Sequence, residues 1–246
     1  MIHQRFSRGG SFGSLLFFPL LVVLVFVSPN ATFASQKSSL RLLYFFNTSC
    51  NHCNDIKRFV FDLSKDYNIE GWISSAQNVN EYPFPVRIGS KEIAPKYFVY
   101  GVPSLVVLRN EKFSQLVSGA ERIQGVKPLL RAFDAGSLSV TEVLEKKPGD
   151  EAFVTGFVKI EGRDMKDSKV FLIDHAKKLL VDPWLPREAV KSKFKKTSPR
   201  LLSHVAGKAV ALKGKLVKGP NGSLRLQVRE EVRYDQENAA PASVAR

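Results

Sequence analysis

Hydrophobic and polar positions follow two different periods along the first half of the chain. Residues 39–47, SLRLLYFFN, form an apolar run without glycine or proline, which predicts a buried strand. Over residues 53–67 apolar side chains return every three or four positions, which predicts an amphipathic helix. Further strands are expected at 68–76, 104–110 and 112–120, a short helix near 92–100 and a closing helix at 125–135. This alternation of strands and helices predicts an α/β domain over residues 35–138.

The second half has the pattern of an all-β domain, expected over residues 151–234. Five strand-like runs cover residues 151–160, 168–174, 177–185, 207–219 and 224–233. A helical run at 186–196 separates the third from the fourth, and the sequence GPNGS predicts a hairpin turn between the last two. Residues 139–150 are expected to form a linker, and residues 235–246 to form a disordered tail.

The first 34 residues have the three parts of a secretory signal. Arg5 and Arg8 precede the apolar run Leu15–Val27, and the small residues Thr32 and Ala34 follow it, which predicts cleavage after Ala34. The run has 13 residues, fewer than the roughly 20 that a membrane-spanning helix needs. An uncleaved N-terminal anchor is the alternative, and it would still leave residues 35–246 outside. We therefore expect a periplasmic or secreted protein.

Basic residues are concentrated in the second half. The net charge is +14, of which residues 151–246 carry +9 and residues 35–150 carry +3. No acidic residue occurs between Glu188 and Glu230. That interval holds a basic stripe: Lys191, Lys193, Lys195, Lys196, Arg200, Lys208, Lys213, Lys215, Lys218, Arg225 and Arg229. Such a stripe suits an anionic envelope component, an acidic protein or nucleic acid, and export argues against nucleic acid. A solvated basic face is the simplest alternative.

The chain has two cysteines, Cys50 and Cys53, in the sequence CNHC. A bridge between them would close a very small loop and constrain little of the unfolded chain, so a structural staple is disfavoured. Zinc as a rule needs four ligands, and the other histidines, His175 and His204, have no paired spacing, so we predict no metal site. The pair falls where a strand gives way to a helix. Backbone N–H groups at the helix start would stabilise a Cys50 thiolate, and a protonated His52 would add to this.

Together, CNHC and the later YGVPS resemble the thioredoxin-like superfamily over about residues 38–135. The resemblance implies a central mixed sheet flanked by helices, with Cys50 as the attacking cysteine and Cys53 as the resolving one. It implies a cis Pro103 beside the pair and pairing of the Val102 backbone with an extended substrate segment. The implied partners are protein thiols and disulfides and a redox partner protein, with no cofactor.

Two positions depart from the family's usual pattern. Tyr44, which we expect in the core, stands where many members carry a buried acid that moves protons. Asn51 and His52 stand between the cysteines in place of the Gly-Pro of thioredoxin, and a histidine at this second position resembles the oxidising DsbA type. Oxidase, reductase and isomerase use the same two cysteines, so the direction of electron flow stays open.

In the second half, three strands, a helix and two strands, with Gly156, Gly162 and Gly207, resemble the OB-fold barrel. The sequence therefore predicts an exported thiol–disulfide oxidoreductase whose small barrel docks it to a partner. The alternative is an envelope assembly or binding factor that acts through the basic barrel, with the redox site secondary.

Overall fold

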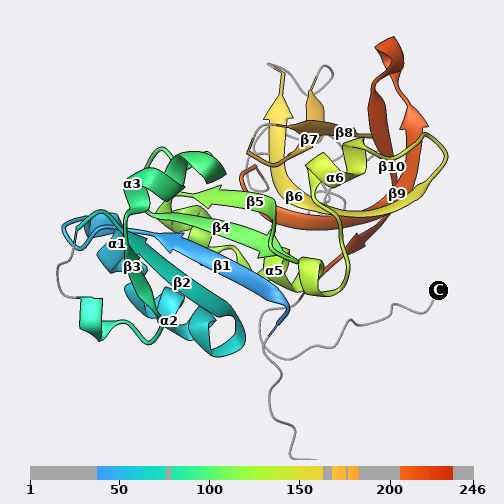
Figure 1. The fold of residues 1–246 in the computed structure, drawn as a ribbon. Helices are drawn as coiled ribbons and strands as arrows, with labels where there is room; N and C mark the ends of the chain where they lie inside the picture. Colours follow the sequence, from blue (N-terminus) through green and yellow to red (C-terminus); the bar gives the residue numbers. More distant parts are fainter. Residues whose placement is uncertain (1–37, 76–78, 163–167, 176, 183–205, 235–246) are drawn as a thin grey trace, which may run out of the picture. The chain divides into compact units, whose positions relative to one another are not determined.

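The computed structural model describes residues 38–75, 79–162, 168–175, 177–182 and 206–234 (Figure 1). The predicted signal segment, the predicted helix at 186–196 and the predicted tail at 235–246 lie outside these ranges. Within them, no helix is both long enough and apolar enough to cross a membrane.

A five-stranded mixed sheet forms the first half. Its strands are β1 (Leu40–Phe45), β2 (Asn68–Ile73), β3 (Val86–Ile88), β4 (Ser104–Arg109) and β5 (Lys112–Ser118). Their order in the sheet is β3-β2-β1-β4-β5. Strands β1, β2 and β3 are parallel, whereas β4 runs antiparallel to β1 and β5 antiparallel to β4. The predicted strands are confirmed. Strand β3 was missed because three residues are too few to show a period.

Short helices connect these strands. They are α1 (Asn51–Asp55), α2 (Lys57–Asp66), α3 (Ser90–Ile93), the 3-10 turns η1 (Val79–Glu81) and η2 (Ala94–Tyr97), α4 (Ala120–Gln124) and α5 (Lys127–Asp134). The helix predicted over residues 53–67 is divided at Ile56, whose backbone (φ −101°, ψ 2°) leaves the helical region. The helix expected near residues 92–100 is confirmed only in part, because α3 and η2 occupy residues 90–97.

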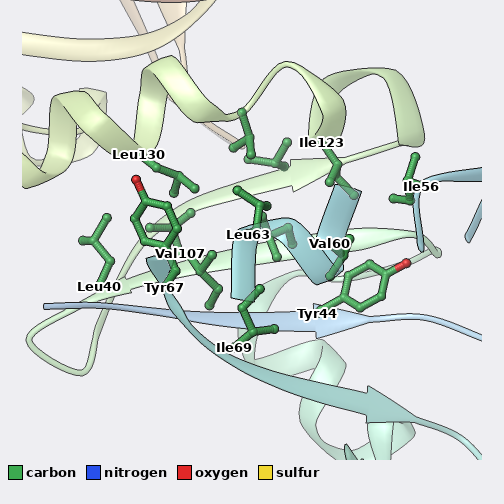
Figure 2. Close-up of a cluster of buried hydrophobic side chains, with 14 of the residues drawn as sticks. Leu40, Tyr44, Ile56, Val60, Leu63, Tyr67, Ile69, Val107, Ile123 and Leu130 are labelled. Carbon is green, nitrogen blue, oxygen red and sulfur yellow. The ribbon is translucent and has the colours of Figure 1, made fainter. Parts of the chain in front are cut away.

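The alternation of side chains along β1 separates two apolar clusters. Leu40, Leu42 and Tyr44 point to the face that α2, α4 and α5 cover, and they pack in the larger cluster (Figure 2). Leu43 and Phe45 point to the other face, where residues of α3 and η2 pack. Because both faces are covered, β1 reads as a continuous apolar run, which is how the sequence identified it.

Residues 139–150, expected as a linker, contain the helix α6 (Val140–Leu144). The Ser139 side chain accepts a hydrogen bond from the Glu142 N–H, and the Glu142 carboxylate accepts one from the Ser139 N–H. This reciprocal capping box stabilises a helix of only five residues. Val140 and Val143 are fully buried in the core of the second half. The segment expected as a linker therefore contains an ordered helix that packs on the barrel core, while the domain boundaries stay a prediction.

A closed five-stranded barrel forms the second half. Its strands are β6 (Glu151–Glu161), β7 (Lys169–Ile173), β8 (Lys178–Val181), β9 (Ala209–Lys218) and β10 (Leu224–Val232), with the turn η3 (Pro220–Gly222) between the last two. Around the barrel the order is β10-β8-β7-β6-β9, and β9 closes it by pairing with β10. Strands β8 and β10 are parallel, and the other pairs are antiparallel. Gly156 has a packing role, since a Cβ there would lie 3.0 Å from the Ile173 carbonyl oxygen.

Candidate functional site

Cys50 is the N-cap residue of α1. The Asn47 side-chain oxygen accepts a hydrogen bond from the Ser49 N–H, and the Asn47 carbonyl accepts one from the Cys50 N–H, so a tight turn joins β1 to the helix. Cys50 itself is extended (φ −89°, ψ 114°), and its Sγ accepts a hydrogen bond from the Cys53 N–H at 3.2 Å. The sulfur thus occupies the place that a serine or aspartate oxygen takes at other helix starts. A negative charge is favoured at this position.

Cys53 lies one turn further on and faces the core. Its exposed fraction is 3%, whereas Cys50 is half-buried, and neither cysteine is in a disulfide in this structure. Burial is the main reason why the pKa of the Cys53 thiol is raised to about 12, and the Cys50 sulfur raises it further. The Asn47 N–H and the Tyr44 hydroxyl act in the opposite direction. Cys53 is therefore protonated at neutral pH in the reduced protein.

The Val102–Pro103 peptide bond is cis and lies beside Cys50. Strand register explains the proximity. Phe45, the last residue of β1, pairs with Ser104, the first residue of the antiparallel β4, so the segments beyond both residues meet at one edge of the sheet. The Cys50 Sγ lies 4.0 Å from the Val102 carbonyl oxygen. The structure thus brings Cys50, Cys53, Val102 and Pro103 together as the sequence predicted, while their roles stay predictions.

Several exposed apolar side chains belong to segments that lead to this edge. Among the described residues, the exposed large hydrophobic side chains are Ile88, Phe98, Tyr100 and Val102. Ile88 ends β3, which runs parallel to β1, and the other three belong to the segment that leads into Pro103. Tyr100 is 90% exposed. Of these four residues, the sequence analysis singled out only Val102. The aromatic residues in PKYFVYGVP could have indicated the others, but the surrounding elements are too short to show which side chains are exposed.

His52 is on the solvent side of α1. Its side chain is 78% exposed, and its Nδ1 lies 3.6 Å from a carboxylate oxygen of Asp55, one turn along the helix. An exposed pair of this kind contributes little to stability. The contact with Asp55 would compete with any action of His52 on the cysteines, so the expected help to the thiolate stays a prediction.

Within the described ranges, no three or more His, Cys, Asp or Glu side chains are grouped so that they could hold a metal ion. Cys50 and Cys53 therefore stand as a pair of thiols without a further ligand from those ranges. The arrangement can carry out thiol chemistry with its own atoms.

Acidic residues neutralise part of the basic stripe. Its described members are Lys208, Lys213, Lys215, Lys218, Arg225 and Arg229; the others lie outside the described residues. Arg225 pairs with Asp182 at 2.9 Å, Arg229 with Glu151 at 2.8 Å, and Lys213 approaches Glu230 at 3.9 Å. Neighbouring strands bring acids from outside the acid-free interval against it. The described barrel surface is therefore less cationic than the sequence interval indicated.

No family model and no curated protein sequence matches the chain. Among solved structures, the chain is similar to a thioredoxin pre-protein of Schistosoma mansoni, with 25% identity over 40% of this chain and 82% of that one, at a TM-score of 0.29. It is also similar to StoA from Bacillus subtilis, with 18% identity over 36% of this chain and 81% of that one, at a TM-score of 0.30. The N-terminal domain of PilB from Neisseria gonorrhoeae has 14% identity over 39% of this chain and 78% of that one, at a TM-score of 0.31.

The first half has a thioredoxin-like fold. Its mixed sheet has the order β3-β2-β1-β4-β5, and α2 and α5 pack in one core with the β1 face. The cysteine pair opens the first helix, and the cis proline precedes the antiparallel strand beside β1. These features, found in this order along the chain, carry the assignment of the fold.

Proposed function

We propose that the chain is a thiol–disulfide oxidoreductase that exchanges disulfides with protein substrates through Cys50 and Cys53. The observation that carries this proposal is the placement of the two sulfurs. Cys50 is half-exposed, caps a helix and lies 4.0 Å from the Val102 carbonyl oxygen, whereas Cys53 is buried behind it. One sulfur can reach a large substrate, and the other can reach only the first.

In the proposed reaction, the Cys50 thiolate attacks a substrate disulfide. A new bond forms between Cys50 Sγ and one substrate sulfur, while the substrate S–S bond breaks and the second sulfur leaves as a thiolate. Cys53 then attacks Cys50 Sγ, which closes the Cys50–Cys53 disulfide and releases the first substrate sulfur. The two electrons gained by the substrate come from the two cysteines. The reverse sequence inserts a disulfide into a substrate dithiol.

We further propose that the protein acts outside the cytoplasm, in the periplasm or after secretion, because of the predicted signal segment at 1–34. We also propose that the second half is an OB-type barrel. The strand order around it and the parallel pairing of its third and fifth strands, β8 and β10, support this assignment. In this proposal the barrel docks the enzyme to a redox partner, to an acidic protein or to an anionic envelope component.

The alternative proposal is an assembly or binding factor that acts through the basic barrel. Removal of residues 151–246 does not separate the two proposals cleanly, because Phe157 belongs to the same apolar cluster as Leu42 and Leu105. Truncation would uncover that cluster and destabilise the thiol site. Single substitutions at the cysteines keep the whole chain, so they test the thiol chemistry without the loss of packing that truncation causes.

Cys50→Ser is expected to reduce turnover of a protein disulfide at least about 100-fold, because a hydroxyl is a poor nucleophile at neutral pH. The measurement is the rate at which the chain catalyses reduction of insulin by dithiothreitol. Ser64→Ala is the matched control. It also changes one side-chain heavy atom, but its hydroxyl donates a hydrogen bond to the Phe61 carbonyl on α2. Full activity of Cys50→Ser would overturn the proposed function.

A further inference from the structure

The Tyr44 hydroxyl is an unpartnered polar group in the core of the thioredoxin-like half. Tyr44 is 1% exposed, and its ring stacks on Phe46 with the ring centres 5.0 Å apart. Among the described residues, no group forms a hydrogen bond with its hydroxyl oxygen. A buried hydroxyl left in this way costs free energy, so its retention in an otherwise apolar cluster requires a reason.

The groups around this hydroxyl supply the reason. Tyr44 and Cys53 belong to one cluster, and each shifts the pKa of the other. Figure 2 shows Tyr44 on β1 near Ile56, at the end of the cluster where α1 meets α2, while Tyr67 lies at the opposite end. Tyr82 and Cys50 also raise the pKa of Tyr44, and Cys53 raises the pKa of Tyr82. The Asn47 N–H and the Tyr44 hydroxyl both lower the pKa of the Cys53 thiol, although the Tyr44 hydroxyl does not have hydrogen-bonding geometry with a described residue in this structure.

The Tyr44 hydroxyl keeps its proton at working pH and can therefore donate a hydrogen bond. Burial is the main cause that raises the pKa of its hydroxyl well above the ordinary value for tyrosine. The Tyr44 hydroxyl therefore cannot accept the proton of the Cys53 thiol. A carboxylate at this position could accept it. The hydroxyl can, however, stabilise the thiolate once the proton has left, because hydrogen bonds to charged acceptors are stronger than those between neutral groups.

We propose that Tyr44 is a positioning residue for the second step of the exchange, holding a hydrogen-bond donor ready for the Cys53 thiolate that attacks the mixed disulfide. This inference rests on the proposed function and assigns it a residue. In the mixed disulfide, Cys50 is bonded to the substrate. The Cys53 proton passes to solvent, and the Cys53 sulfur, now charged, accepts the Tyr44 O–H. Attack on Cys50 Sγ then forms the intramolecular disulfide and breaks the bond to the substrate sulfur, which leaves as a thiolate.

The test uses an aromatic disulfide that releases a coloured thiolate, mixed with the reduced full chain in a stopped-flow instrument. Attack by Cys50 releases one equivalent, and attack by Cys53 releases the second in a later phase. Tyr44→Phe is expected to leave the first phase unchanged and to slow the second about 10- to 100-fold, the usual worth of a hydrogen bond to a charged group. Tyr67→Phe is the matched control, since it removes a buried hydroxyl that interacts with Asp134 instead.

The pH dependence of the second phase reports the Cys53 thiolate, whereas the unchanged first phase and the Tyr67→Phe control separate this role from a structural one. Below the Cys53 pKa, the second phase is expected to accelerate about tenfold for each pH unit, because the thiolate fraction rises in that proportion. Tyr44→Phe should displace this profile to higher pH without changing its slope. An undisplaced profile and an unchanged second phase would overturn the role of Tyr44. Absence of the first phase in the unsubstituted chain would instead overturn the proposed function.

Discussion

A Cys53→Ser chain is expected to accumulate covalent complexes with its protein substrates. Cys50 retains its place at the helix start and can still attack a substrate disulfide. The serine hydroxyl that replaces the resolving thiol cannot release the substrate, so the mixed disulfide should persist at least about 100 times longer than in the unsubstituted chain. Denaturing gels without reductant, run after acid quenching, measure these complexes directly.

Because Cys53 is buried, only Cys50 is expected to form covalent complexes with substrates. With an exposed fraction of 3% and a pKa raised to about 12, Cys53 has neither the access nor the thiolate population to attack a protein disulfide itself. Cys50→Ser is therefore the matched control and should give no complexes. If the two single variants trapped equal amounts of substrate, the division of labour between the cysteines would be wrong.

Ile56→Ala is expected to lower the free energy of unfolding by about 2–5 kcal/mol, the usual cost of truncating a large buried aliphatic side chain. Ile56 is fully buried and lies where the backbone breaks between α1 and α2, three residues after Cys53. The cavity would form beneath the short helix that carries both cysteines. Urea denaturation followed by circular dichroism measures the loss.

Arg58→Ala is the control for this substitution, because Arg58 is exposed two positions further along the same region. Exposed substitutions of this kind usually change stability by less than about 0.5 kcal/mol. Equal stability losses in the two variants would show that the packing beneath α1 does not hold the cysteine-bearing helix in place.

The elements that the sequence predicted best are those with a long, strong period. The hydrophobic pattern predicted β1 from its apolar run, α2 from its helical spacing and the barrel strands from their five runs. Burial on one or two faces of such an element determines which residue types can occupy each position. The cysteine pair and Val102–Pro103 were also predicted together. Two motifs far apart in the chain met as expected because β1 and β4 are antiparallel neighbours.

The features that were missed depend on short elements or on contacts between distant residues. Helix α6 has five residues, and its capping box and two buried valines become visible only when the barrel core surrounds them. The break at Ile56 interrupts a sequence whose helical period continues through it. Asp182 and Glu151 lie far along the chain from the arginines that they neutralise. The orphan hydroxyl of Tyr44 likewise required the surrounding side chains.

The redox equilibrium of the full chain in glutathione buffers tests the central claim most directly. We predict one reversible two-electron transition, with a Cys50–Cys53 disulfide formed at the oxidised end and identified by mass spectrometry. A midpoint near about −120 mV would indicate an oxidant, and one near about −270 mV a reductant. If both thiols stayed reduced at every glutathione ratio, or oxidised only between molecules, Cys50 and Cys53 would not be a redox pair and the account would be wrong.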